Sequence, residues 1–196
     1  DNYDLMLEKL SKDEKYKRLL DIGCGRGEWL EKASSFGFEC LGIEKDESMA
    51  LEAQKNLRSN IKVGDIFDIL PEINDASYNI VSIFHVIEHL TNQQLGVLLQ
   101  GCKRILDDDG ILILETPSID NLVTATREFH LDPTHINPIN PERLIFLLEF
   151  LGFDSTQCLV LNADQKYSKN IFSLQMVINR VGRDLCVVAS NSEVTT

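Results

Sequence analysis

Acidic and glycine residues recur at every second position of one segment, in a pattern that suits a nucleoside ligand. Asp21 ends an apolar run, and Gly23, Gly25 and Gly27 follow it. Glycine lets the backbone take positive φ angles and approach a ligand closely. The next apolar segment ends in Glu44, at the place where an acid can hold a ribose diol. The pattern predicts a strand, a glycine turn and a helix around such a ligand.

The glycine spacing separates two kinds of nucleoside ligand. Dinucleotide-binding turns favour G-x-G-x-x-G, with a pyrophosphate at the helix N-terminus. Here Glu28 occupies the first turn of the expected helix. Its carboxylate would repel a pyrophosphate but suits a ligand that carries sulfonium and ammonium groups. The pattern therefore disfavours NAD(P) and favours a cationic nucleoside.

All four histidines fall in two short segments. His85 and His89 follow one apolar run, and His130 and His135 follow the next. Loops after neighbouring parallel strands border one crevice, so we expect all four rings to cluster beside the ligand. Histidine can act as a general base near neutral pH, and together with Glu88 it can hold a divalent metal.

Apolar runs alternate with helical patterns along the chain. The expected strands cover residues 18–22, 38–43, 61–65, 78–84, 111–115, 156–161 and 184–190. The expected helices cover residues 3–17, 48–59, 93–106 and 141–151, with another between the last two strands. The acidic run 107–110 is expected to end a helix. This order predicts an α/β fold of Rossmann type: a mostly parallel, seven-stranded, doubly wound sheet with an antiparallel last strand.

Length and composition fit one domain over residues 1–196, with an N-terminal lead-in at 1–17. The net charge of −12 disfavours nucleic acid as a partner. No run approaches the ~20 apolar residues that span a bilayer, and no signal peptide is visible. Five cysteines without a C-x-x-C pair indicate neither a disulfide framework nor a zinc site. We therefore expect a reducing cytoplasm.

The segment from Asp21 to Gly27 resembles motif I of the class I S-adenosylmethionine (SAM) methyltransferases, and the resemblance extends over about residues 19–190. It implies that SAM is the cofactor and S-adenosylhomocysteine the product. Asp21 would orient the methionine moiety, Glu44 would hold the ribose, and Asp65 would bind the adenine amino group. An alternative for Asp65 is a helix N-cap. The implied cofactor residues are Asp21, Gly23, Cys24, Gly25, Glu44, Lys45, Asp65, Ile66, Phe84 and His85.

The segment His85-Val86-Ile87-Glu88-His89 resembles the E-V-I-E-H segment of Hen-type small-RNA 2′-O-methyltransferases and of ubiquinone O-methyltransferases. In those families Glu and His bind a divalent metal that chelates a diol or catechol. The resemblance implies Glu88, His89 and His135 as ligands, with His130 as the competitor of His135. His85 replaces a glutamate, which favours Mn²⁺, Fe²⁺ or Zn²⁺ over Mg²⁺.

Two other interpretations of these side chains stay open. In the first, no metal is bound, and one or more of the histidines acts as the base or binds the acceptor. In the second, the histidines are structural. The candidate catalytic residues are His135, His89, Glu88, His85 and His130.

The connection at residues 116–140 is long, and long connections are usually functional. We expect a short helix at 121–128 and an acceptor-binding wall around it. Residues 116–153 resemble methyltransferases of bacterial polysaccharide assembly, which are often fused or adjacent to glycosyltransferases. This implies a sugar hydroxyl of a lipopolysaccharide or capsule as acceptor, and the start at Asp1 fits a domain of a larger enzyme. The alternatives are a small quinone or catechol acceptor, or a SAM-binding module without catalysis.

Overall fold

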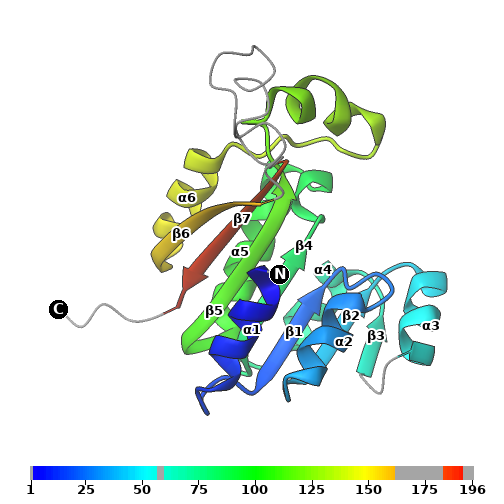
Figure 1. The fold of residues 1–196 in the computed structure, drawn as a ribbon, viewed down its shortest axis with the longest axis vertical. Helices are drawn as coiled ribbons and strands as arrows, with labels where there is room; N and C mark the ends of the chain where they lie inside the picture. Colours follow the sequence, from blue (N-terminus) through cyan, green and yellow to red (C-terminus); the bar gives the residue numbers. More distant parts are fainter. Residues whose placement is uncertain (1, 57–59, 162–182, 192–196) are drawn as a thin grey trace.

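The computed structural model describes residues 2–56, 60–161 and 183–191. Within them lies a seven-stranded sheet of order β3-β2-β1-β4-β5-β7-β6 (Figure 1). The strands are β1 (Arg18–Ile22), β2 (Glu39–Glu44), β3 (Asn60–Val63), β4 (Tyr78–Phe84), β5 (Leu106–Pro117), β6 (Asp154–Leu161) and β7 (Asp184–Ser190). The first five are parallel, and β7 is antiparallel to both of its neighbours. The predicted fold class is confirmed.

Helices cover both faces of this sheet. The helices are α1 (Asn2–Ser11), α2 (Glu28–Ser35), α3 (Glu47–Asn56), α4 (Ile66–Ile69), α5 (Asn92–Ile105) and α6 (Pro141–Phe150). On one face, α1, α2 and α3 bury Leu7, Leu30 and Ala53 against the strands. On the other, α5 and α6 bury Leu98 and Leu148. Because the central strands are covered on both faces, β4 is buried continuously from Asn79 to Ile83 rather than at alternate positions.

Helix α5 ends at Ile105, just before the acidic run 107–110, as expected, but the run belongs to β5, which therefore begins earlier than the predicted strand. Polar side chains from neighbouring elements hold it extended. Asn79 donates to the carboxylate of Asp107. Asn191 donates from its side chain to the carbonyl of Asp107 at 2.7 Å and from its backbone to the carbonyl of Gly110 at 2.8 Å. These long-range bonds override the local turn preference of Asp and Gly.

Most other predicted elements are present within one or two residues of their expected ends. The lead-in helix is shorter than expected and ends at Ser11. The predicted helix at 121–128 appears as a π-helical turn, η3 (Thr124–Glu128), followed by the 3₁₀ turn η4 (Phe129–Leu131). The helix expected between the last two strands lies outside the described residues. Among the described helices, none is long and apolar enough to cross a membrane.

Candidate cofactor and acceptor site

The predicted cofactor residues meet at the carboxyl ends of β1, β2 and β4. Gly23, Gly25 and Gly27 all have positive φ angles, between 55° and 85°. The amides of Gly23 and Cys24 donate to the carbonyl of Ile43 at 2.8 and 3.1 Å, which ties the turn to β2. Helix α2 begins directly after the turn, at Glu28, as the glycine pattern predicts.

Glu44 is held rigidly beside this turn. One carboxylate oxygen accepts from the amide of Gly25 at 2.9 Å, and the other accepts from the amide of Asp46 at 2.8 Å. The side chain is buried. The two backbone amides hold the carboxylate in one orientation, and its oxygens retain lone pairs for a diol.

Asp21 lies in a buried network next to Glu44. Its Oδ1 accepts from the Ser82 hydroxyl at 2.7 Å, and that hydroxyl accepts from the Trp29 indole at 2.9 Å. Burial raises the pKa of Asp21 to about 7; the Ser82 hydrogen bond opposes this shift, and the Glu44 charge adds to it. A cationic ligand beside Asp21 would favour its charged form.

The remaining predicted cofactor residues differ in their surroundings. Burial, with the carboxylates nearby, raises the pKa of the Cys24 thiol to about 12, so the thiol is neutral at physiological pH. Asp65 accepts from the amide of Phe67 at 2.9 Å and caps the N-terminus of α4. This is the N-cap role given above as the alternative to adenine binding. Lys45 is exposed, and Ile66 is partly buried.

An aromatic cluster that the sequence did not indicate covers this side of the site. Tyr3, Trp29 and Phe84 have ring centroids 5.1 to 5.5 Å apart. The Tyr3 hydroxyl is buried and has no hydrogen-bond partner. Helix α1 thus contributes to the site, although its charged sequence gave only the expectation of a lead-in.

Glu88 is the centre of the acceptor side. Its side chain is completely buried. One carboxylate oxygen accepts from the Thr116 hydroxyl at 3.1 Å, whereas the other, Oε1, has no hydrogen-bond partner. The backbone carbonyl of Glu88 accepts from the amides of Ile136 and Asn137, each at 3.0 Å. These two bonds fix the long connection against η2 (Ile87–His89).

Two histidines direct a free ring nitrogen toward this carboxylate. The Nδ1 of His135 donates to the carbonyl of Phe129 at 2.9 Å, and the Nδ1 of His89 lies 3.2 Å from the carbonyl of Thr134. A carbonyl can only accept, so His135 carries its proton on Nδ1 and its lone pair on Nε2. The Nδ1 of His89 also lies 2.9 Å from the Thr134 hydroxyl; that hydroxyl donates to Asp132 at 2.6 Å and therefore accepts from His89, which gives His89 the same tautomer. The Nε2 of His135 lies 4.0 Å from Glu88 Oε1. The three residues can offer ligand atoms that all lie within 4.8 Å of one another.

His85 joins the same cluster from the end of β4. Its φ of 53° is unusual for a residue other than glycine, and its amide donates to the carbonyl of Glu115 at 2.9 Å. The ring lies between two carboxylates, with Nδ1 3.4 Å from Glu88 and Nε2 3.3 Å from Glu115. The Glu88 carboxylate beside the ring raises the pKa of His85.

His130 does not join this cluster, which corrects the prediction that all four histidines converge. Its ring is exposed and packs against Phe129 at 5.6 Å. Because η4 is a tight turn, neighbouring side chains diverge, and the apolar Phe129 takes the buried position.

The cluster contains two acids that the sequence reasoning missed. Glu115 ends the parallel part of β5, and Asp184 begins β7 opposite Pro117. Burial and the Asp184 carboxylate raise the pKa of Glu115 to about 7. Glu115 is an acid at the end of the predicted strand 111–115, just as Asp21 and Glu44 are acids at the ends of apolar runs. This shared position could have identified Glu115 from the sequence. Asp184 is brought there only by the antiparallel pairing.

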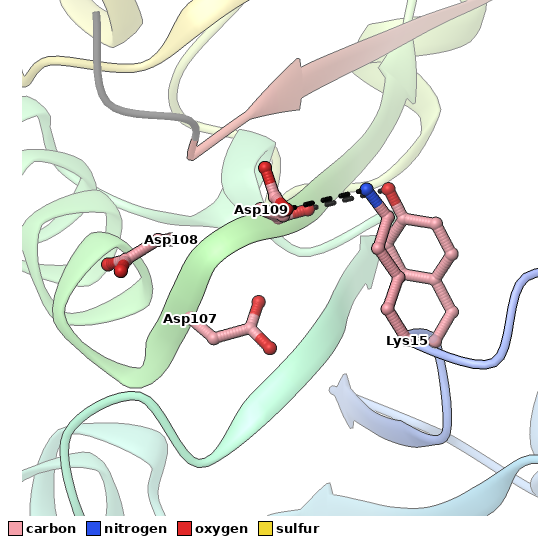
Figure 2. A pocket seen from close by; sticks show the side chains of 5 residues that line it. Lys15, Asp107, Asp108 and Asp109 are labelled. Atoms are coloured by element: carbon pink, nitrogen blue, oxygen red, sulfur yellow. Dashed lines mark hydrogen bonds and ion pairs between the residues drawn. The ribbon is translucent and has the colours of Figure 1, made fainter. Parts of the chain in front are cut away.

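Two hollows lie at opposite ends of the sheet. One of about 180 Å³ opens beside His135. It is lined by Pro117, Thr124, Glu128, Phe129, His135, Arg183 and Asp184. The other, of about 250 Å³, lies at the amino end of β5, where Lys15 contacts Asp109 at 3.6 Å (Figure 2). Of these two hollows, only the first is lined by a histidine.

The fold and the glycine turn define a Rossmann-type methyltransferase domain. A family model described as "Methyltransferase domain" matches residues 2–157, and the chain belongs to that family. The cofactor of such domains is SAM, and one similar fold, phosphoethanolamine N-methyltransferase 2 of Haemonchus contortus, is solved with it (17% identity, TM-score 0.73, 98% of this chain and 53% of that one).

Relatives support the same class. A protein of Mycolicibacterium smegmatis, named a probable SAM-dependent methyltransferase, is 27% identical over 78% of this chain and 58% of its own length. A ubiquinone biosynthesis O-methyltransferase of Glaesserella parasuis is 30% identical over 51% of this chain and 45% of its own. A solved SAM-dependent methyltransferase of Archaeoglobus fulgidus has 27% identity and a TM-score of 0.76, with 96% and 94% of the two chains covered. The chain spans about half the length of the curated relatives it matches.

Proposed function

We propose that the protein is a SAM-dependent O-methyltransferase whose acceptor is a sugar hydroxyl in bacterial polysaccharide assembly. The observation that carries the O-methyl assignment is the buried Glu88 oxygen, which has no partner and faces the ring nitrogens of His89 and His135. A hydroxyl is a weak nucleophile near neutral pH. It needs a group that accepts its proton or one that lowers its pKa. The Glu88 cluster provides such a group beside the hollow.

On the cofactor side, Glu44 would hold the ribose hydroxyls and Asp21 would face the positively charged methionine end. The acceptor oxygen attacks the methyl carbon, the carbon–sulfur bond breaks, and its electron pair stays on sulfur in S-adenosylhomocysteine. The hydroxyl proton passes to a histidine, with Nε2 of His135 as our choice, because Phe129 fixes its tautomer. SAM carries an activated methyl group, so alignment is the main task of the remaining site.

Glu88, His89 and His135 also fit a divalent cation. Three lone-pair atoms so close to one another repel unless a proton or a cation lies between them. The carbonyls that bind both Nδ1 atoms are the outer partners typical of metal-binding histidines. Two nitrogens and one oxygen suit Mn²⁺, Fe²⁺ or Zn²⁺. Such a cation, when bound, would lower the pKa of the acceptor hydroxyl.

The sugar assignment rests on the sequence of residues 116–153, and a glycosyltransferase is the partner that this resemblance suggests. A quinone or catechol acceptor is the second candidate, favoured by the ubiquinone O-methyltransferase relatives. Glu128, Arg183 and Asp184 line the hollow beside His135, and their charged groups can bond sugar hydroxyls.

Transfer of labelled methyl from SAM would test the proposal. We expect label in bacterial glycan fractions, none in catechols, and loss of transfer in His135→Ala with S-adenosylhomocysteine binding retained. Label in catechols alone would replace the sugar by the second candidate, and no label in any acceptor would overturn the proposal. Chelation by EDTA and restoration with Mn²⁺ would separate the cation from the histidine base.

A further inference from the structure

A second group of cation ligands stands beside the first. His85, Glu115 and Asp184 come from the ends of β4 and β5 and from the start of β7. Each offers one ligand atom, and the three atoms lie within 4.8 Å of one another. None of them belongs to the Glu88–His89–His135 set. We propose that these residues form a separate divalent cation site, so that the acceptor side holds two cations.

Glu88 directs the His85 ring toward this site. The Oε1 atom of Glu88, whose side chain is completely buried, lies 3.4 Å from Nδ1 of His85. A carboxylate accepts, so a neutral His85 carries its proton on Nδ1 and its lone pair on Nε2. That Nε2 lies 3.3 Å from Glu115 Oε1. Ligands held about 2.1 Å from one ion are separated by roughly 3 to 3.5 Å, and this pair has that separation.

Charge also favours a cation at this place. Glu115 is buried, with 8% of its surface exposed, and Asp184 is a second carboxylate in the same cluster. Two carboxylates in one site repel each other, and an ion with two positive charges relieves that repulsion. One nitrogen and two oxygens suit Mn²⁺ or Zn²⁺.

The two sites differ in access to solvent. The first is closed, because Glu88 is fully buried and the His135 side chain is only 15% exposed. At the second, the His85 side chain is 49% exposed. Catalytic metal sites keep a position open for a further ligand. The second cation therefore has more room than the first to bind an oxygen of the acceptor. Only this last role rests on the proposed function.

Direct binding of Mn²⁺ tests the site without any methyl transfer. The whole chain is freed of metal with EDTA, dialysed and titrated with Mn²⁺, with free ion followed by electron paramagnetic resonance. We expect Glu115→Gln and Asp184→Asn each to lose about one equivalent of Mn²⁺ relative to the unchanged protein. Asp108→Asn, an exposed acid at the other end of β5, removes the same charge and should lose none.

Retained S-adenosylhomocysteine binding shows that each variant is folded. Asp184 is less buried than Glu115, so its substitution is the milder change. Equal Mn²⁺ binding by the unchanged protein and both variants would overturn the proposal, since a protonated His85 would then bridge Glu88 and Glu115 by itself. If the protein binds Mn²⁺ in the expected amounts but transfers no methyl group, the proposed function fails and the cation site stands.

Discussion

The two sides of the site differ in how far their charges are satisfied. On the cofactor side, Glu44 receives backbone amides at both oxygens, and Asp21 is hydrogen-bonded to Ser82. On the acceptor side, Glu88 is fully buried and keeps one oxygen without a partner. On the cofactor side, the hydrogen bonds to the carboxylates are made before any ligand arrives. On the acceptor side, the open carboxylate oxygen gains its partner only when a ligand binds. A shared scaffold can thus keep one cofactor and change its acceptor.

The substitution Glu88→Gln should have the largest effect and tests whether the two sides act independently. The substitution keeps the shape and the bond from Thr116 but removes the charge that the histidines face. We expect methyl transfer to fall by about a hundredfold or more. The binding of S-adenosylhomocysteine, measured by calorimetry, should change by less than about twofold. Glu72→Gln, at an exposed ion pair with Lys62, is the control. A parallel loss of cofactor affinity would mean that the two sides are not separate.

The reverse experiment is Glu44→Gln on the cofactor side. The amide group can accept only one of the two backbone bonds and places a donor against the other amide, so the local orientation is lost. We expect the affinity for SAM to fall about tenfold to a hundredfold, in line with one or two charged hydrogen bonds. Mn²⁺ binding should be unchanged. Weakened Mn²⁺ binding in this variant would contradict the division of the site.

Gly23 is the point where the two sides touch. A Cβ at this position would collide with Cγ2 of Val86, the residue between His85 and η2, and the φ of 74° strains any side chain. We expect Gly23→Ala to lower the free energy of unfolding by about 1 to 3 kcal/mol. Gly96→Ala, within α5 and with no atom near the new Cβ, should instead raise it by about 0.5 to 1 kcal/mol. Denaturant melts compare the two, and equal effects would rule out the contact.

Local patterns predicted the cofactor side better than the acceptor side. The glycine turn and Glu44 lie in short segments whose conformation is set by their own residues and by the adjacent strand. The acceptor side depends on distant contacts: the carbonyl of Glu88 anchors Ile136 and Asn137, and antiparallel pairing brings Asp184 to Glu115. Spacing could place His135 near the crevice but could not show that Phe129 would turn His130 outward.

Asp21 gives the smallest and most specific test, because it links the cofactor side to pH. Its pKa of about 7 in the folded protein lies above the ordinary value of 3.8. The folded state therefore holds this proton to higher pH than the unfolded chain, and the free energy of unfolding falls as pH rises from about 4 to about 7. Glu115 contributes in the same direction, so Asp21→Asn should remove only part of this slope.

The cationic cofactor should reverse the shift at Asp21 by favouring its carboxylate, so that SAM binding near pH 7 releases a fraction of a proton. Calorimetry in two buffers of different ionisation enthalpy measures that release. We expect Asp21→Asn to abolish it while Glu115→Gln leaves it unchanged. Proton release that persists in Asp21→Asn would place the coupled group elsewhere, and the pH dependence of cofactor binding would then not arise from Asp21.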